Sequence, residues 1–90
     1  MKRYEVIVLS KVRKKVDKLP MFIKTKVLLV LKTKLKDFDI ALKILDIKKL
    51  KWYENRYRLR IWKYRILFEK YEDKLVILVI DIWSRWDVYK

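Results

Sequence analysis

The stretch RYRLRIWKYRILFEK, residues 56–70, decides the fold. In residues 56–61, apolar side chains and arginines alternate strictly, so an extended chain carries them on opposite faces. Residues 64–70 have the composition of a second strand, and only Trp62 and Lys63 separate the two segments. Because a two-residue connection is the commonest one in β-hairpins, we predict an antiparallel hairpin. One of its faces is apolar and the other is basic.

Strands are also predicted towards both ends of the chain. Residues 75–83, LVILVIDIW, are apolar on both faces, as in a strand from the interior of a sheet. Glu72 and Asp73 supply the turn before it. Residues 4–9, YEVIVL, are rich in β-branched side chains and predict a further strand. We expect these strands and the hairpin to form one sheet.

Two helices are predicted between the first strand and the hairpin. After Ser10, which we expect to cap the first helix, apolar residues recur at helical spacing until Pro20 ends it. A second helix starts at Pro20 and runs to near Lys36, with one apolar stripe. Residues 37–51 fit neither period well, and we interpret them as a helical turn followed by an extended segment.

The predicted order of elements is therefore β-α-α-β-β-β. A helical hairpin near the N-terminus that packs on one face of a small, mostly antiparallel sheet defines an α+β fold. A chain of 90 residues supports one modest hydrophobic core, so we expect a single domain over residues 1–90.

The composition excludes most routes to catalysis. The chain has no His and no Cys, which excludes disulfides, a thiol nucleophile and a Ser-His-Asp triad, and we expect neither a cofactor nor a metal site. Any chemistry must come from Arg, Lys, Tyr and carboxylates. The longest apolar run, residues 75–80, is too short to span a bilayer, so we expect a cytoplasmic protein without a membrane partner.

The charge predicts a polyanionic partner. The chain carries 25 Lys and Arg against 11 Asp and Glu, a net charge of +14. Such a surplus attracts polyanions through counterion release, so RNA or DNA is the first partner to test and an acidic protein segment the second. The alternative is that the lysines only keep a small apolar domain in solution.

Arginines of the hairpin form a basic ladder. Arg56, Arg58 and Arg60 project from one face at intervals of about 6–7 Å, because side chains repeat every second residue of a strand. Arg65 and Arg85 join the same face if the register is tight. Guanidinium groups bind phosphate oxygens in a planar fork, so this ladder suits an RNA backbone and the charge of a pentavalent phosphorane. The alternative is a solvent-exposed face that happens to contain arginine.

Three segments together resemble the RelE/ParE toxin family. They are LDIKKLKWY at 45–53, YRLRIWKYR at 57–65 and IWSRWDVYK at 82–90. The resemblance covers nearly the whole chain and implies the RelE-like fold described above. It also implies a type II toxin–antitoxin toxin that cleaves mRNA on the ribosome and is silenced by an acidic, RelB-like antitoxin. No obligate homo-oligomer is expected.

The resemblance also assigns roles to residues of this chain. The catalytic residues it implies are Arg58, Arg60, Arg65, Arg85 and Tyr89, with RNA contacts from Arg56, Lys63 and Lys90. Tyr89 is the best proton-transfer group, because guanidinium does not easily release a proton. Glu54 is a weaker candidate, and Ser84 stands where many relatives have histidine. Two other functions stay open: a ParE-like gyrase poison, although ParE members usually lack the terminal tyrosine, and a basic RNA-binding module without catalysis.

Four tryptophans stand where RelE-type sequences commonly have glycine. They are Trp52, Trp62, Trp83 and Trp86, in a chain that contains no glycine at all. Trp62 falls in the hairpin turn, where a positive φ is expected and a non-glycine residue costs about 1–2 kcal/mol. Our first hypothesis is that the gene has UGA codons that specify glycine at these positions. The competing hypothesis is that the tryptophans are genuine and stack on RNA bases, in which case Trp83 and Trp86 crowd Arg85 and impair activity.

Overall fold

A computed structural model describes residues 2–84 of the chain. Three α-helices, a short 3₁₀ helix and five strands are found in this part. In chain order they are β1 (Glu5–Val8), α1 (Ser10–Asp17), α2 (Met21–Lys32), the 3₁₀ helix η1 (Lys34–Lys36), α3 (Phe38–Ile44), β2 (Asp46–Lys49), β3 (Arg56–Ile61), β4 (Tyr64–Tyr71) and β5 (Val76–Ser84). No helix among these residues is long and apolar enough to cross a membrane.

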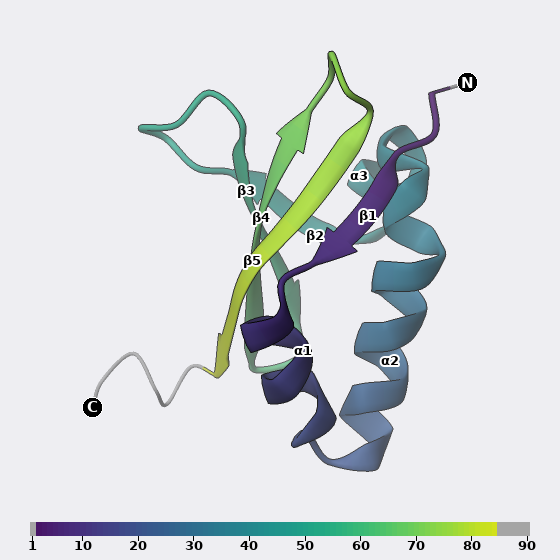
Figure 1. The fold of residues 1–90 in the computed structure, drawn as a ribbon, viewed down its shortest axis with the longest axis vertical. Helices are drawn as coiled ribbons and strands as arrows, with labels where there is room; N and C mark the ends of the chain where they lie inside the picture. Colours follow the sequence, from purple (N-terminus) through teal and green to yellow (C-terminus); the bar gives the residue numbers. More distant parts are fainter. Residues whose placement is uncertain (1, 85–90) are drawn as a thin grey trace.

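The five strands form one mixed sheet in the order β1-β5-β4-β3-β2 (Figure 1). The pairs β2–β3, β3–β4 and β4–β5 are antiparallel, and β1 pairs with β5 in parallel. The apolar strand β5 thus lies between two neighbours, as its sequence predicts. The α+β class and the mostly antiparallel sheet are confirmed.

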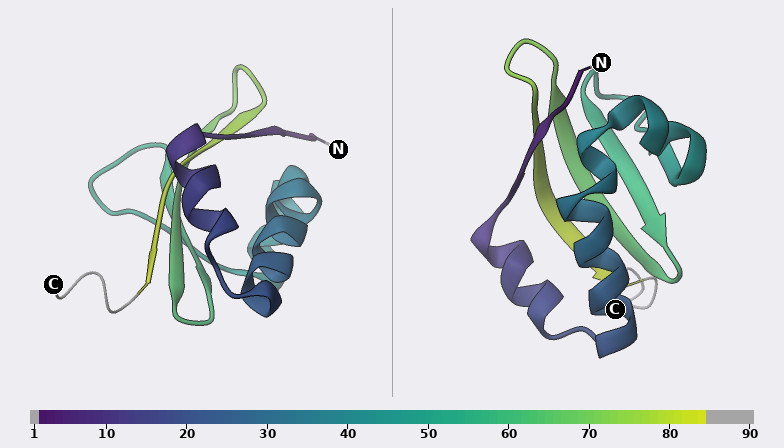
Figure 2. Two further views of the ribbon diagram at one scale, coloured as in Figure 1. Left: turned by 60° about the horizontal axis from the view of Figure 1, so that its bottom comes forward. Right: turned by 90° about the vertical axis from the view of Figure 1, so that its right-hand side faces the viewer.

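The helices cover one face of the sheet and leave the other face open (Figure 2). Each helix buries one row of apolar residues against the sheet, and the strands contribute every second side chain to the same core. Leu59, Ile66, Phe68, Ile77 and Val79 of the sheet are fully buried. Phe68 lies flat against Tyr57, with ring centroids 5.4 Å apart, and Phe38 of α3 meets both rings edge-on.

The start of α1 differs from the prediction. Leu9 is the N-cap residue, Ser10 is the first helical residue, and no side chain caps the helix. The first helical N–H groups of α1 thus have no side-chain partner, and the parallel pairing of β1 with β5 delivers the chain directly into α1. The second helix is also shorter than predicted, because α2 ends at Lys32 and the 3₁₀ helix η1 follows it.

The segment from 37 to 51 adds two elements to the predicted order. Asp37 caps α3 by accepting a hydrogen bond from the backbone N–H of Ile40 at 3.4 Å. Strand β2 follows directly and pairs with β3, with Asp46 opposite Arg60. The interpretation of this segment as a helical turn followed by an extended segment is confirmed. The predicted order β-α-α-β-β-β is incomplete, because it omits α3 and β2.

The turns β3–β4 and β4–β5 each contain a residue with positive φ. Trp62 has a φ of 55° at the first position of the two-residue turn between β3 and β4, the position that glycine occupies in type II′ turns. The predicted backbone strain at Trp62 is confirmed. Leu75 has a φ of 52° at the end of the turn before β5, which spans residues 72–75 and is longer than the predicted pair of Glu72 and Asp73.

Candidate functional site

The open face of the sheet carries the arginines of β3 and β4. In the register of this hairpin, Arg60 lies directly opposite Arg65. Arg58 lies opposite Leu67, one step along the same face, and Arg56 lies opposite Glu69 at the far end. Because directly opposed side chains have Cβ atoms about 5 Å apart, Arg60 and Arg65 present two guanidinium groups to the same ligand.

Asp46 of β2 is the carboxylate nearest to this arginine pair. Its Oδ2 lies 3.0 Å from Nε of Arg60, and its Oδ1 lies 3.8 Å from a terminal nitrogen of Arg58. Both contacts lie partly in solvent, which weakens them. The Nε atom of Arg58 is buried and has no hydrogen-bond partner among residues 2–84. Asp46 therefore positions the two arginines without fully neutralising them.

Arg56 is in a different environment at the other end of β3. Its Nε lies 2.8 Å from Oε2 of Glu69, whose other carboxylate oxygen accepts a 2.7 Å hydrogen bond from the hydroxyl of Tyr71. The guanidinium also lies over the ring of Tyr53, 4.4 Å from its centroid. The Tyr71 hydroxyl, followed by the Arg56 guanidinium, lowers the pKa of Glu69. Arg56 thus has a fixed partner within the protein, unlike Arg65.

Arg65 has the freest charge of the four arginines on this face. Within the part of the chain that the structure describes, no carboxylate lies within ion-pair distance of Arg65. Its cross-strand neighbours are Arg60 on β3 and Trp83 on β5. A guanidinium that lacks an internal partner is available to an external anion.

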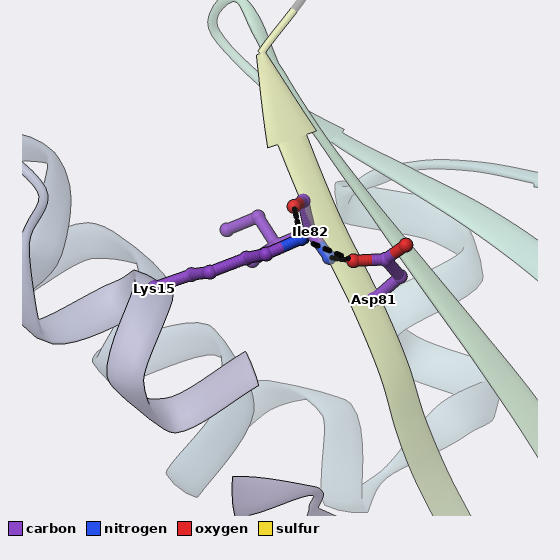
Figure 3. Close-up of polar contacts among 3 residues, drawn as sticks. All are labelled: Lys15, Asp81 and Ile82. Carbon is purple, nitrogen blue, oxygen red and sulfur yellow. Dashed lines mark hydrogen bonds and ion pairs between the residues drawn. The ribbon is translucent and has the colours of Figure 1, made fainter. Parts of the chain in front are cut away.

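The end of β5 is held by α1 (Figure 3). Pairing with β1 stops at Val79, so the following residues of β5 lose their neighbour on that edge. The Nζ of Lys15 lies 3.0 Å from Oδ1 of Asp81 and 3.5 Å from the carbonyl oxygen of Ile82. The same carboxylate oxygen accepts a 2.8 Å hydrogen bond from the backbone N–H of Ile82. These side chains replace the missing strand. Burial acts to raise the pKa of Asp81, but the hydrogen bonds from Lys15 and from the backbone of Ile82 outweigh it, so the pKa is lowered.

The structure brings together some of the predicted site residues. Arg58, Arg60 and Arg65 share one part of the open face, and Lys63 lies in the adjoining turn with its Nζ 4.9 Å from the Trp62 ring centroid. Arg56 lies on the same face, but its ion pair with Glu69 holds it at the other end of β3. Ser84 ends β5 opposite Tyr64, beside Arg65. The predictions for Arg85, Tyr89 and Lys90, and for Trp86, lie outside the described residues.

Three residues near this site were missed from the sequence. Asp46 lies in the segment whose period was ambiguous, so its position beside Arg60 could not be read without the pairing of β2 with β3. Lys15 and Asp81 are 66 residues apart, and nothing in either local sequence indicates the contact. The apolar pattern of β5 contained one signal, since Asp81 is the only charged residue in residues 75–83.

This fold is shared with toxins of toxin–antitoxin systems whose structures have been solved. The structure is similar to that of RelE in a RelB–RelE complex from Methanococcus jannaschii, with 26% identity over 93% of this chain and 95% of that chain and a TM-score of 0.78. For a RelE–RelB complex from Pyrococcus horikoshii the identity is 23%, the coverage 94% and 97%, and the TM-score 0.79. For the intact E. coli RelBE complex the identity is 19%, the coverage is 90% of this chain and 95% of that chain, and the TM-score is 0.70.

The sequence itself defines the family. The family model of the ParE toxin of type II toxin–antitoxin systems, parDE, matches residues 6–89. The chain belongs to this family and is a type II toxin of the RelE/ParE superfamily. Comparison with curated proteins gives no significant match. The resemblance seen in the sequence is thus confirmed.

Proposed function

We propose that this toxin is a ribosome-dependent endoribonuclease that cleaves mRNA in the decoding site. The observation that carries the proposal is the opposed pair of Arg60 and Arg65 on the open face, with Arg58 in the next row. Cleavage of RNA needs preorganised positive charge where the phosphate becomes more negative in the transition state. Arg65 supplies that charge most freely, because it has no ion pair within residues 2–84.

The proposed reaction is an internal transfer of the phosphoryl group. The ribose 2′-oxygen attacks the adjacent phosphorus after its proton is removed, and the bond from phosphorus to the 5′-oxygen of the next nucleotide breaks. The 5′-oxygen takes up a proton, so the products are a 2′,3′-cyclic phosphate and a free 5′-hydroxyl. Arg58, Arg60 and Arg65 stabilise the negative charge on the phosphorane, together with Arg85.

Tyr89 is the proposed proton-transfer residue. A phenol donates or accepts a proton more readily than guanidinium does. We expect Tyr89→Phe to lower the cleavage rate while ribosome binding stays intact. Cleavage by this variant at the rate of the unsubstituted toxin would remove Tyr89 from the mechanism.

The proposed protein partner is an acidic, RelB-like antitoxin. The solved RelE structures that this chain resembles contain RelB, and a net charge of +14 attracts an acidic chain. A groove between α2, the end of α3 and β3 exposes Leu29 and Ile44 and has Lys26, Lys34 and Arg60 among its lining residues. An amphipathic acidic helix in this groove would bury the apolar residues and pair with Arg60.

The experiment that tests the function is primer extension on mRNA in a purified translation reaction. It is run for the chain as printed and for a version with glycine at 52, 62, 83 and 86, each with and without ribosomes. Ribosome-dependent cuts support the proposal. Cuts by the glycine version alone would show either that the four codons specify glycine or that genuine tryptophans inactivate the toxin. The absence of cuts from both versions would contradict an endoribonuclease.

Gyrase poisoning is the second candidate, and the match to the ParE family model favours it. A gyrase poison leaves mRNA intact and traps gyrase on cleaved DNA. Measurement of linearised plasmid after incubation with gyrase, ATP and the toxin separates this activity from RNA cleavage. Salt-dependent RNA binding without either kind of cleavage would indicate an RNA-binding module.

A further inference from the structure

An exposed aromatic cluster lies at the tip of the β3–β4 hairpin. The ring of Trp62 is 5.6 Å from that of Phe22, in the first turn of α2, and 6.3 Å from that of Tyr64. Trp62 is 60% exposed and Phe22 is 58% exposed. Exposed aromatic rings that gather from separate elements mark a contact surface more often than isolated ones do.

The backbone at this tip is strained. Trp62 has a φ of 55°, a conformation that disfavours residues with a Cβ atom and suits glycine. The ring stays mostly in solvent, although one side of it packs on Phe22 and Tyr64. A bulky, mostly exposed residue in a strained conformation is not part of the hydrophobic core, and strain of this kind occurs at functional sites.

Positive charge surrounds the same ring. The Nζ of Lys63 lies 4.9 Å from the ring centroid of Trp62 and 5.8 Å from that of Tyr64. Trp62 and Lys63 line one hollow together with Arg60 and Arg65. Trp62 thus borders the arginine pair to which the phosphate is assigned, whereas Phe22 and Tyr64 support its ring from the helix-covered side of the sheet.

We propose that Trp62, supported by Phe22 and Tyr64, stacks on an unpaired RNA base next to the phosphate held by Arg60 and Arg65. This inference rests on the proposed function and follows the hypothesis that the tryptophans are genuine, and it adds a base contact to that function. In a single strand, each phosphate links two nucleotides whose bases are free to turn outward. An aromatic ring beside a phosphate site is therefore placed to stack on one of these bases. Lys63 adds charge that pairs with the neighbouring phosphate.

Trp52 provides a matched control within the same chain. It is also exposed, at 85%, and also has a lysine near its ring, with the Nζ of Lys51 5.5 Å from the centroid. Trp52 lies in the loop between β2 and β3, and in the described residues its ring meets no other aromatic ring. Loss of Trp52 should leave binding of an RNA strand at the arginine pair unchanged.

Two substitutions separate the ring from the turn. Trp62→Gly removes the ring and relieves the backbone strain, whereas Trp62→Phe keeps an aromatic ring and the strain. The probe is a fluorescein-labelled six-nucleotide RNA, compared with the same oligomer carrying one abasic nucleotide at each position in turn, and binding is measured by fluorescence anisotropy. Thermal unfolding is recorded for each variant.

We expect Trp62→Gly to weaken binding of the intact oligomer about tenfold while its Tm stays unchanged or rises. Trp62→Phe should bind within about threefold of the unsubstituted toxin. One abasic position should weaken binding to the unsubstituted toxin and leave binding to Trp62→Gly unchanged. Arg65→Gln should lower the salt dependence of binding, which Trp62→Gly should not change.

The outcomes distinguish the base contact from the proposed function. If Arg65→Gln weakens binding and Trp62→Gly does not, the base contact is wrong and the phosphate site stands. If Trp52→Ala weakens binding as much as Trp62→Gly, the effect is not specific to the hairpin tip and the inference is overturned. If the unsubstituted toxin does not bind the oligomer, the base contact is overturned, whereas the proposed function fails only if primer extension shows no cuts on ribosomes.

Discussion

The two faces of strand β3 come from one alternating sequence, but they differ in how far their environment can be inferred from that sequence. On the inner face, Leu59 is buried under the helices, and Tyr57 lies against Phe68. Apolar side chains are interchangeable partners there, so alternation alone locates the core. On the outer face, whether an arginine has an ion-pair partner on β4 depends on the residue opposite it. Arg56 faces Glu69, whereas Arg60 faces Arg65. The inner face can be inferred from its own strand, and the outer face only from its neighbours.

The largest effect is expected from a cavity on the inner face. Phe68 is fully buried and contacts the rings of Tyr57 and Phe38, so Phe68→Ala should lower the free energy of unfolding by about 3–5 kcal/mol. Urea denaturation followed by circular dichroism measures it. Leu67→Ala, one residue along and on the half-buried outer face, is the control. An equal loss for both variants would erase the distinction between the faces.

The second effect separates the arginines of the outer face. Arg65→Gln should lower RNA cleavage tenfold or more, because it removes an unpaired charge beside Arg60, and should change stability by less than about 0.5 kcal/mol. Arg56→Gln should lower cleavage less and stability more, because Glu69 would lose its partner. Single-turnover cleavage and urea denaturation of both variants test this. The reverse order would place the phosphate site at Arg56.

The third effect is a pH dependence that comes from Glu69. Its pKa is lowered in the folded state by the Tyr71 hydroxyl and by Arg56, from a usual value of 4.5. The carboxylate therefore stabilises the fold fully above its unfolded pKa, and this contribution is lost as the pH falls through the lower folded pKa. Denaturation of the unsubstituted toxin and of Glu69→Gln at pH 6 and about pH 3 should show a smaller loss in the variant. Parallel losses would contradict a role for Glu69.

The smallest effect concerns the end of β5, where side chains replace a strand. Lys15 is about half exposed in its ion pair with Asp81, so Lys15→Met should cost less than about 1 kcal/mol. The local effect should be clearer, with faster amide hydrogen exchange at the N–H of Ile82. Asp17, which pairs with Arg13 on α1 and Lys24 on α2 away from β5, offers the control Asp17→Asn. Unchanged exchange in Lys15→Met would show that Asp81 alone holds this edge.

The sequence predicts the fold well where one period dominates. Alternation in residues 56–61 and the two-residue turn after them predict the hairpin, and the doubly apolar pattern of residues 75–83 predicts an interior strand. It fails for β2 and α3, because the apolar residues of 37–51 fit neither period and the strand is stabilised by pairing with β3. Ser10 does not cap α1, because the helix starts one residue earlier than predicted. Leu9 is the N-cap residue, and its N–H donates to the carbonyl of Val79 on β5, which fixes where the chain leaves the sheet.

The site is predicted in its residue types and less well in its charges. Arg58, Arg60 and Arg65 do share the open face, as their spacing indicates. The partners Asp46 and Glu69 come from other strands, so the sequence cannot show that Arg56 is paired and Arg65 is not. Roles of Arg85 and Tyr89 stay predictions, as does the identity of the codons for the four tryptophans. Sequencing of the gene tests the latter, since TGG at all four positions would contradict glycine.

The parallel pairing of β1 with β5 has a consequence for synthesis. Glu5 pairs with Val76 and Val8 with Val79, so strands from opposite ends of the chain close the sheet. During translation, β1 and all three α-helices emerge before β5 exists to pair with β1. Pairing over such a separation also slows folding. The five-stranded sheet that carries the arginine face is therefore complete only after residues 76–84 have been made.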